Sequence, residues 1–416
     1  MKKALIVSFD LPKKGETSPS LSIASLIAYA KADIRYGSEF CIKHVSFNMS
    51  DDHDRPLSYF MGEILDNCIQ CNTIVFSVYI WSEYLVVEIL GKLRGMGYQG
   101  KIVLGGYQII GQKETLNHDY PECDIFICGY GENSLTESIF MEKPARPVHL
   151  NRQPNFNELP SPYLSREIDV MHGERMVRLE TKRGCPYQCS FCAHRDLAEN
   201  RVYEINKSRI IEEIEWFNAR KTRKVNILDP VFNAGNEYLL VLEEMLRMKF
   251  SSVISLQCRF EMIKGEKGNR FIALVEKLDA VLEFGIQTIF EEESRAINRP
   301  INPDYIRKVL RLLKERGIAY EISLIYGLPN QTVDSFKRSI DFALENGATK
   351  ILAFPLMLLK GTPLYAQKRK WNLEEKALGN FRIPTVVSGN TFKEDDWLRM
   401  DEIAHRVAGE MSYVRI

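Results

Sequence analysis

The stretch Glu180-Thr-Lys-Arg-Gly-Cys-Pro-Tyr-Gln-Cys-Ser-Phe-Cys192 carries three cysteines, Cys185, Cys189 and Cys192, in a C-x3-C-x2-C pattern. Three closely spaced thiolates can bind three irons of a [4Fe–4S] cube and leave the fourth iron without a protein ligand. An open coordination position separates a catalytic metal site from a closed structural one, a rule best documented for zinc. The pattern therefore predicts a catalytic iron–sulfur site.

Zinc is the alternative interpretation of these cysteines, with His194 as a fourth ligand. Structural zinc sites are usually built from pairs of CxxC-like segments, often far apart in the sequence. Here all the ligands would come from one loop, and no cysteine lies beyond Cys258. The iron–sulfur interpretation is therefore favoured, and the same cysteine distribution argues against an auxiliary cluster in the C-terminal part.

The chain around the cysteines alternates between short apolar segments and helical ones. About six βα units predict an open, partial (β/α)6 barrel over residues 176–365. In such folds the functional groups lie at the carboxyl ends of the strands, and the cysteines directly follow the first predicted strand. The predicted strands are Met176–Lys182, Lys224–Asp229, Val253–Phe260, Ala280–Gln287, Ala319–Tyr326 and Lys350–Leu358, and the helices between them include Lys207–Ala219, Glu237–Met248, Asp304–Arg316 and Thr332–Asn346.

These segments resemble the radical S-adenosylmethionine (radical SAM) superfamily. In that family the amino and carboxylate groups of SAM chelate the fourth iron, and the reduced cluster cleaves SAM to methionine and a 5′-deoxyadenosyl radical. The resemblance implies an enzyme with a [4Fe–4S] cluster and SAM as cofactors. It also implies that Phe191, which precedes the third cysteine, stacks near the adenine.

Further SAM-binding residues follow from the resemblance alone. The segment Asn226–Asn233 resembles the one that contacts the SAM amino group, which makes Asp229 a candidate. Leu282–Thr288 and Ala296–Arg299 resemble the element that holds the ribose and the methionine carboxylate, and Leu324–Thr332 resembles the one that approaches the adenine. Each residue also has an ordinary alternative role in a surface ion pair, a helix cap or a turn. The candidates in these segments are Glu283, Gln287, Arg299 and Gly327.

Residues 1–140 show the same alternation with shorter units, which predicts a doubly wound, Rossmann-like α/β domain with a largely parallel sheet. The expected strands are Ala4–Phe9, Phe40–Phe47, Thr73–Ile80, Lys101–Gly105 and Asp124–Cys128, and the expected helices are Ser20–Lys31, Ser58–Asn67 and Ser82–Met96.

That domain resembles the cobalamin (B12)-binding domain that precedes many radical SAM cores. Glycines at strand ends let the backbone approach a ligand closely, although such turns also need glycine for a positive φ alone. Cobalamin domains that supply a cobalt ligand carry Asp-x-His-x-x-Gly after the first strand, whereas here the loop from Asp10 reads Asp-Leu-Pro-Lys-Lys-Gly. Several relatives bind the corrinoid without that histidine, so cobalamin stays the implied cofactor and a degenerate scaffold is the alternative. The implied contacts are Ser77, Tyr79, Gly105, Gly106, Gly129 and Gly131.

The other segments are expected to connect or extend these domains. Five prolines between residues 143 and 165 predict a surface linker over 141–175. Residues 366–416 are expected to form a short helical extension, with a helix near Asp395–Met411.

Cys258 lies near the carboxyl end of the third barrel strand. A thiol that faces the barrel mouth there would return a hydrogen atom to a substrate radical, and the alternative is a packed core cysteine. The other cysteines are expected to be buried as small hydrophobic residues. They are Cys41, Cys68, Cys71, Cys123 and Cys128.

Charge and hydropathy narrow the function classes. Lys+Arg and Asp+Glu both number 55, and a chain without net charge lacks the basic face that non-specific nucleic-acid binding normally needs. The apolar run at the N-terminus is too short for a signal peptide, and no stretch of about 18 apolar residues predicts a membrane span. We therefore expect a cytoplasmic protein whose thiols stay reduced.

The sequence thus predicts a radical SAM enzyme that modifies an unactivated carbon of a small-molecule or peptide substrate, with flavodoxin or ferredoxin as electron donor. In the favoured version, residues 1–140 hold methylcobalamin and the enzyme transfers its methyl group in natural-product or peptide biosynthesis. The alternatives are an epimerase, dehydratase or rearrangement enzyme with Cys258 as hydrogen donor, or a non-catalytic iron–sulfur or corrinoid sensor.

Overall fold

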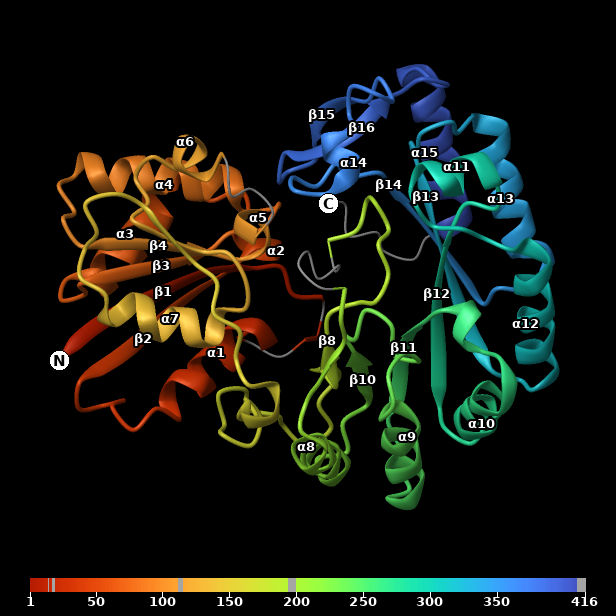
Figure 1. The fold of residues 1–416 in the computed structure, drawn as a ribbon, viewed down its shortest axis with the longest axis horizontal. Helices are drawn as coiled ribbons and strands as arrows, with labels where there is room; N and C mark the ends of the chain where they lie inside the picture. The colour runs from red at the N-terminus through yellow and green to blue at the C-terminus, as the bar shows by residue number, and fades with distance from the viewer. Residues whose placement is uncertain (14, 17–18, 111–114, 194–199, 410–416) are drawn as a thin grey trace. The chain divides into compact units, whose positions relative to one another are not determined.

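The computed structural model describes residues 1–13, 15–16, 19–110, 115–193 and 200–409. The chain forms two compact units (Figure 1). The first comprises Met1–Asp169 with Gly379–Ile383, and the second comprises Val170–Leu378 with the chain from Pro384 onward.

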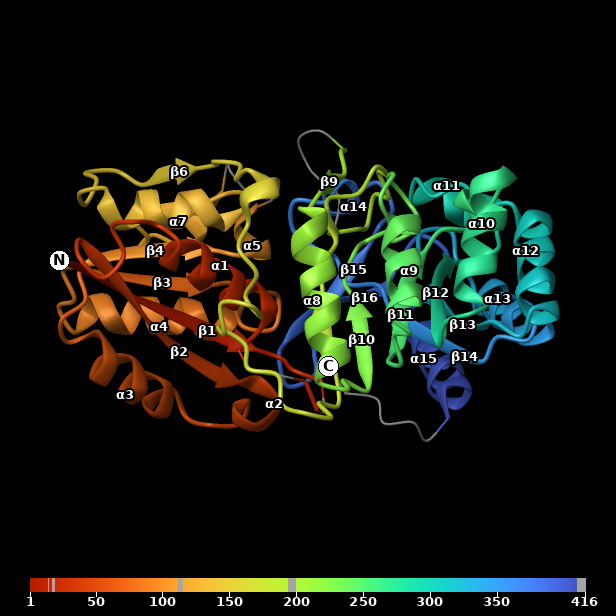
Figure 2. The same cartoon turned by 90° about the horizontal axis from the view of Figure 1, so that it is seen from below.

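The first unit is built on a six-stranded parallel sheet in the order β2-β1-β3-β4-β5-β6. Helices cover both faces of the sheet, with α1 and α7 on one side and α3 and α4 on the other (Figures 1 and 2). This arrangement confirms the predicted doubly wound domain. The strands are β1 (Lys2–Asp10), β2 (Phe40–Asn48), β3 (Thr73–Ser77), β4 (Lys101–Gly105), β5 (Ile125–Ile127) and β6 (Val148–Leu150), and the helices are α1 (Leu21–Lys31), α2 (Met49–Asp52), α3 (Leu57–Cys68), α4 (Glu83–Gly95), α5 (Tyr107–Ile110), α6 (Leu116–Asp119) and α7 (Gly131–Phe140).

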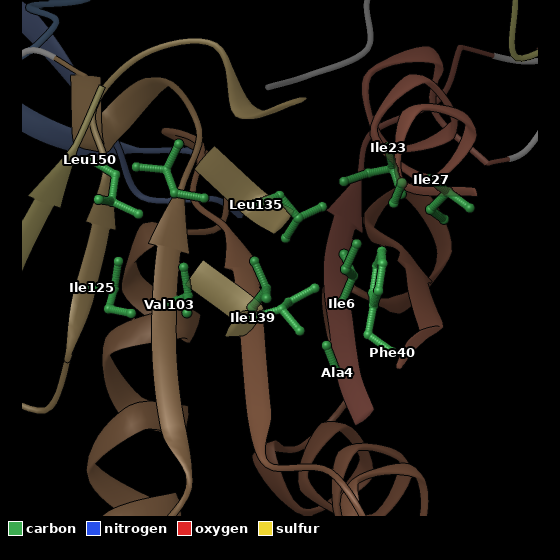
Figure 3. Packing of buried hydrophobic residues seen from close by; sticks show 13 residues of the cluster. Ala4, Ile6, Ile23, Ile27, Phe40, Val103, Ile125, Leu135, Ile139 and Leu150 are labelled. Atoms are coloured by element: carbon green, nitrogen blue, oxygen red, sulfur yellow. The ribbon is translucent and has the colours of Figure 1, made fainter. Parts of the chain in front are cut away.

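Aliphatic side chains from several strands form one core of this unit (Figure 3). Ile6 and Val103 from the sheet pack with Ile27 of α1 and Ile139 of α7. Because both faces are covered, β1 is an almost continuous apolar run rather than an alternating one. This core keeps the carboxyl ends of the strands in register at one edge of the sheet.

The stretch 143–150, which its prolines led us to assign to a linker, instead adds strand β6 to the sheet. Val148 pairs with Ile125 and Leu150 with Ile127. Proline is compatible with an edge strand because no neighbour needs its missing N–H, and Pro147 directly precedes β6. The first unit therefore continues past residue 140.

The second unit contains a six-stranded parallel sheet in the order β14-β13-β12-β11-β10-β7, with helices along its outer side (Figures 1 and 2). This confirms the predicted partial barrel. Its strands are β7 (Val177–Leu179), β10 (Lys224–Ile227), β11 (Val253–Cys258), β12 (Ala280–Gln287), β13 (Ala319–Tyr326) and β14 (Lys350–Pro355), and its helices are α8 (Lys207–Ala219), α9 (Tyr238–Arg247), α10 (Gly265–Val275), α11 (Glu291–Ala296), α12 (Pro303–Glu315), α13 (Val333–Glu345), α14 (Pro363–Ala366) and α15 (Glu394–Ala408).

The two faces of the barrel strands carry different side chains. Tyr326 at the end of β13 packs on Phe336 of α13 and on Trp397 of α15, with ring centroids 5.5 and 5.8 Å apart. Residues that alternate with Tyr326 therefore lie on the opposite, inner face. Glu321 is one of them, and its Oε2 lies 3.5 Å from Lys350 Nζ of β14. The inner face thus carries an ion pair between two neighbouring strands.

The C-terminal segment contains a hairpin that the sequence did not predict. Strands β15 (Glu374–Leu378) and β16 (Ile383–Ser388) pair with each other. The amide of Val386 in β16 donates to the Leu356 carbonyl at the exit of β14 at 2.9 Å. The expected helix is present as α15, which packs against β13 and β14. Among the described residues, no helix has the length and apolar content to span a bilayer.

Candidate functional site

The cysteine loop begins directly after β7 and a two-residue strand, β8 (Lys182–Arg183), which pairs with β9 (Tyr203–Glu204). Cys185 and Cys189 are buried and Cys192 is half-buried. Gly184 holds a φ of +80°, and a side chain there would clash with the carbonyl oxygen of Arg201. Only glycine therefore fits between the strand and the first cysteine.

Hydrogen bonds attach the cysteine loop to two other parts of the barrel. The Ser190 amide donates to the Ile297 carbonyl at 2.9 Å, and the Ser190 carbonyl accepts from the Leu364 amide at 2.9 Å. Asn298 Nδ2 donates to the Gln188 carbonyl at 2.8 Å. The loop is thus fixed at its centre before any cofactor binds.

Two guanidinium groups converge on one of the three sulfurs. Arg259 donates to Cys189 Sγ at 3.3 Å, and Arg299 donates to the same atom at 3.6 Å. Burial raises the pKa of the Cys185 thiol, and the nearby Arg259 guanidinium opposes that rise. Three thiols beside two cations are a donor set that fits an anionic iron–sulfur cluster. His194, the expected fourth ligand in the zinc interpretation, lies outside the described residues.

No group of three or more His, Cys, Asp and Glu side chains in the described part of the chain is arranged to hold a single metal ion. A cluster of four irons spreads its ligating sulfurs over a larger body than one ion does. The [4Fe–4S] cluster on these three cysteines stays a prediction.

Asp229, predicted to lie at the SAM amino group, faces the strand that leads into the cysteine loop, and its contact with SAM stays a prediction. Its Oδ1 accepts from the backbone amides of Thr181 and Lys182 at 2.8 and 3.2 Å, and its Oδ2 accepts from the Thr181 hydroxyl. Burial raises the pKa of Asp229 to about 6, and Lys182 is the first of the groups that oppose the rise. The carboxylate therefore positions the exit of β7.

Lys182 is buried and completes this arrangement. Its Nζ donates to the carbonyls of Phe232 and Ala234 at 2.8 and 2.6 Å and lies 3.9 Å from Asp229 Oδ2. Burial lowers the pKa of this ammonium, and the Asp229 carboxylate opposes the fall. Lys182 thereby ties the start of the cysteine loop to the loop that follows β10.

Gln287 and Arg299 lie together at the carboxyl end of β12. A side chain on Gly285 would clash with Gln287 Nε2 and would lie 3.5 Å from an Arg299 nitrogen. Arg299 also donates to the Gly285 carbonyl. Glu283 lies two residues before Gly285 on β12, in register with Glu321 of β13. The structure thus brings Gln287 and Arg299 to one end of the barrel, with Arg299 beside Cys189, whereas Glu283 lies in the middle of β12.

Gly327 and Phe191 occupy the other two positions predicted to lie near the adenine. Gly327 has a φ of +86°, and its amide donates to Gln331 Oε1 at 2.7 Å. A side chain there would lie 3.3 Å from the Val386 carbonyl oxygen. Phe191 is half-buried beside Cys192. The adenine contacts of both residues stay predictions.

Cys258 lies on the helix-covered side of the barrel wall. It pairs in register with Phe284, which pairs with Ile322 on the same face as Tyr326. The thiol is 5 % exposed, and burial raises its pKa. This placement favours a packed core cysteine, and its role as a hydrogen donor stays a hypothesis.

The residues expected to contact cobalamin gather at the carboxyl edge of the first unit's sheet. Ser77 ends β3, and its hydroxyl is buried without a hydrogen-bond partner in the described structure. Tyr79 stacks on Trp81 with ring centroids 4.6 Å apart. Ligands of doubly wound domains bind at this carboxyl edge of the sheet. The unsatisfied hydroxyl fits a polar ligand at this edge.

The glycines at this edge have partners within the chain. Gly106 has a φ of +99°, and a side chain there would lie 2.7 Å from the Val78 carbonyl oxygen. A side chain on Gly129 would clash with Asn151, and one on Gly131 would lie 2.8 Å from Leu26. Gly105 accepts a hydrogen bond from the Val78 amide at 2.7 Å. Chain packing therefore explains Gly106 without a ligand, whereas a side chain on Gly105 would make only an ordinary contact with Ile127 at 3.5 Å. The contact of these glycines with cobalamin stays a prediction.

Sequence reasoning missed Arg259, Lys182 and Tyr187. Arg259 immediately follows the third barrel strand, so its position at a carboxyl strand end was a signal that could have selected it. Lys182 precedes the first cysteine by three residues, but nothing in the sequence indicated that it is buried. Tyr187 lies between two cysteines, and its contact with Arg259 joins residues far apart in the chain.

Comparison with known proteins agrees with this geometry. Residues 179–343 match the family model described as the radical SAM superfamily. This segment of the chain is therefore similar to a radical SAM domain.

Individual relatives narrow the likeness further. TokK of Streptomyces tokunonensis, a cobalamin-dependent radical SAM methyltransferase, is 25% identical over 337 residues, which are 73% of this chain and 49% of that protein. The 2-(S-pantetheinyl)-carbapenam-3-carboxylate methyltransferase of Streptantibioticus cattleyicolor is 25% identical over 381 residues, which are 79% of this chain and 55% of that protein. The chain thus spans about half the length of these curated relatives.

A solved structure extends the likeness to both units. The cobalamin-dependent S-adenosylmethionine radical enzyme OxsB, with aqua-cobalamin and S-adenosylmethionine bound, matches with a TM-score of 0.68 at 14% identity. The match covers 97% of this chain and 66% of that one. The two proteins therefore share a fold, which in this chain is a doubly wound domain followed by a partial barrel.

Proposed function

We propose that this chain is a cobalamin-dependent radical SAM methyltransferase. The observation that carries the proposal is the cysteine loop at the carboxyl end of β7, fixed in a barrel that follows a complete doubly wound unit. The two sequence relatives, both named as methyltransferases, support it. A barrel alone would fit many radical reactions, so the doubly wound unit is what favours methyl transfer.

In this proposal Cys185, Cys189 and Cys192 hold a [4Fe–4S] cluster. When bound and reduced, such a cluster supplies the electron that cleaves SAM. The protein fixes the three thiols through the Ser190 backbone and neutralises part of their charge with Arg259 and Arg299. Burial of this region excludes water, which strengthens these charge interactions.

The carboxyl end of β12 is the proposed binding place of the methionine part of SAM. Arg299 reaches both the Cys189 sulfur and the Gly285 carbonyl, so its guanidinium lies between the cluster loop and the barrel strand. A guanidinium in that place can pair with a carboxylate that also binds the cluster. Gln287 adds an amide within the same group of side chains.

The carboxyl edge of the first unit's sheet is the proposed cobalamin surface. Cobalamin, when bound, supplies a cobalt that carries a methyl group. Ser77 offers an unsatisfied hydroxyl there, and the Tyr79–Trp81 pair offers a flat aromatic surface beside it. The proposed substrate is a small molecule or a peptide, and the proposed electron donor is a small redox protein such as flavodoxin or ferredoxin.

The test uses the full chain, reconstituted without air with iron, sulfide and hydroxocobalamin, and then reduced in the presence of SAM with a deuterated methyl group. We expect 5′-deoxyadenosine and deuterated methylcobalamin, with 5′-deoxyadenosine lost in a variant whose three cysteines are alanine. Formation of 5′-deoxyadenosine without corrinoid binding would favour an epimerase, dehydratase or rearrangement enzyme. Absence of 5′-deoxyadenosine would favour a sensor.

The mass of the product formed in deuterated water then distinguishes the candidate reactions. Methyl transfer adds one methylene in mass, whereas epimerisation through an exchangeable thiol adds one deuterium. A deuterium increment that disappears in Cys258→Ala would contradict the methyltransferase proposal and would assign the hydrogen-donor role to Cys258.

A further inference from the structure

Arg259 has a backbone that is fixed on both sides. The residue directly follows β11 and is 6 % exposed. Its amide donates to Asn233 Oδ1 at 2.9 Å, and its carbonyl accepts from Asn233 Nδ2 at 2.9 Å. Asn233 belongs to the loop after β10 and is 1 % exposed. This reciprocal pair determines where the Arg259 side chain leaves the barrel wall.

The guanidinium of Arg259 is also fixed, by the cysteine loop itself. Its central carbon lies 3.8 Å from the centroid of the Tyr187 ring. Tyr187 lies between Cys185 and Cys189 in the sequence. A guanidinium over an aromatic ring keeps its N–H groups available at its edge, and one of them donates to Cys189 Sγ at 3.3 Å.

The charges around Cys189 Sγ are mainly positive. Arg299 donates to the same sulfur at 3.6 Å. Glu261 is the acidic partner of Arg259, but its Oε1 lies 4.0 Å from the guanidinium and its side chain is 46 % exposed. Solvent weakens such an exposed charge, while the buried guanidinium keeps most of its effect on the sulfur. The site therefore favours additional negative charge.

We propose that Arg259 is a positioning residue that holds Cys189 and makes the cluster easier to reduce. The inference rests on the proposed function, because it requires a [4Fe–4S] cluster on these cysteines. Reduction transfers one electron from an external reductant to the cluster and makes it more negative by one charge. Hydrogen bonds and positive charge at a ligating sulfur stabilise that form, and so raise the reduction potential.

The direct test is Arg259→Gln in the full, anaerobically reconstituted chain. Glutamine removes the charge and the stacked fork while it keeps a polar side chain. The midpoint potential is measured without SAM, by titration with dithionite followed by electron paramagnetic resonance. We expect a ratio of reduced to oxidised cluster about tenfold lower at any fixed potential, which is a shift of ~59 mV to more negative values for one electron.

Arg295→Gln is the matched control. Arg295 is exposed on α11, where it pairs with Glu291, and it lies four residues before Arg299. The substitution Arg295→Gln also removes one positive charge from the second unit. Arg295, however, does not contact a cysteine in the described structure. Its midpoint potential should equal that of the unaltered chain.

Arg259→Gln with full iron content and an unchanged midpoint potential overturns the inference. If that variant does not retain iron, Arg259→Lys and Tyr187→Leu decide. Lysine keeps the charge, and the leucine variant keeps Arg259 but removes its stacking surface, so both should retain iron with a smaller negative shift. Loss of iron in both variants assigns Arg259 a purely architectural role and overturns the inference. Absence of a cluster in the unaltered chain would instead contradict the proposed function.

Discussion

At the scale of single residues, a buried ion pair determines how the chain enters the cysteine loop. Asp229 accepts the backbone amides of Thr181 and Lys182, and Lys182 Nζ returns to two carbonyls of the Asp229 loop. Both side chains are buried, with exposed fractions of 2 % for Lys182 and 0 % for Asp229. Such a pair is costly to break by removing one partner, because the other charge stays buried.

We expect Asp229→Asn to destabilise the second unit strongly. Asparagine keeps the shape but leaves the Lys182 ammonium without its counter-charge, which costs roughly 3–5 kcal/mol. The calorimetric transition of the unit should fall by on the order of 10 °C. The double variant Lys182→Met with Asp229→Asn should be more stable than Asp229→Asn alone. A double variant as unstable as the sum of both single variants would show that the two residues act independently.

A second prediction concerns the glycine at the start of the cysteine loop. Gly184→Ala meets both a positive φ and the Arg201 carbonyl oxygen, so the loop must move and iron binding should be lost. Gly173 has a similar φ of +75° in the same unit but open space around it. Gly173→Ala should therefore cost only about 1–2 kcal/mol and retain iron. Equal iron content in the two variants, measured after reconstitution, would refute this explanation.

The sequence predicted which residues are chemically distinctive but not which way they face. The cysteine pattern selected the loop because its spacing is local. Asp229 was expected at a ligand, whereas its carboxylate satisfies backbone amides. Arg259 was missed because its contact with Cys189 joins residues 70 positions apart. Orientation and long-range contacts depend on packing, which a single sequence does not encode locally.

At the scale of elements, α15 completes the outer layer of the barrel at β13 and β14. Trp397 packs on Tyr326, and the Tyr326 hydroxyl donates to Asp401 Oδ1 at 2.5 Å. The C-terminal segment is therefore part of the barrel's packing.

We expect Trp397→Ala to destabilise the second unit by roughly 3–5 kcal/mol, because it leaves a large cavity against β13. Leu398 is the neighbouring control. It is 48 % exposed, whereas Trp397 is 7 % exposed, so Leu398→Ala should change stability by less than about 0.5 kcal/mol. Calorimetry of both variants provides the comparison. Equal effects would mean that α15 does not pack on the barrel as described.

Most elements could be predicted from their hydrophobic pattern, and the exceptions have physical reasons. The barrel strands β12 and β13 alternate strictly between buried and partly exposed residues, which is the pattern that a one-sided strand produces. Strand β15 reads Glu-Glu-Lys-Ala-Leu and is mostly exposed, so no apolar pattern marked it. Strand β6 has three residues and follows a proline, which favoured a linker over a sheet edge.

At the scale of the whole molecule, each unit has its own sheet and its own core. The proposed cluster ligands belong to the second unit, and the proposed cobalamin surface belongs to the first. We therefore expect the iron–sulfur cluster and cobalamin to bind independently of each other. A variant with alanine at Cys185, Cys189 and Cys192 should lose its iron and still bind hydroxocobalamin as the unaltered chain does. Iron and cobalt per chain measure this, and loss of both metals together would contradict it.

The fold class followed from the alternation of strands and helices in both halves of the chain. The cobalamin contacts did not, because glycine at a strand end has the same sequence signal whether it serves a ligand or a neighbouring chain segment. Gly106 illustrates this, since the Val78 backbone alone excludes a side chain there. Only a measurement on the protein with cobalamin bound distinguishes a glycine that contacts the ligand from one that only accommodates a neighbouring chain segment.

The most direct test of the central claim is the Mössbauer spectrum of the full chain reconstituted with 57Fe, recorded before and after addition of SAM. A [4Fe–4S] cluster on three cysteines predicts about four irons per chain, of which about one quarter change their signal when SAM occupies the open position. A chain that takes up no iron but one tightly bound zinc, or a cluster whose spectrum SAM leaves unchanged, would contradict the claim.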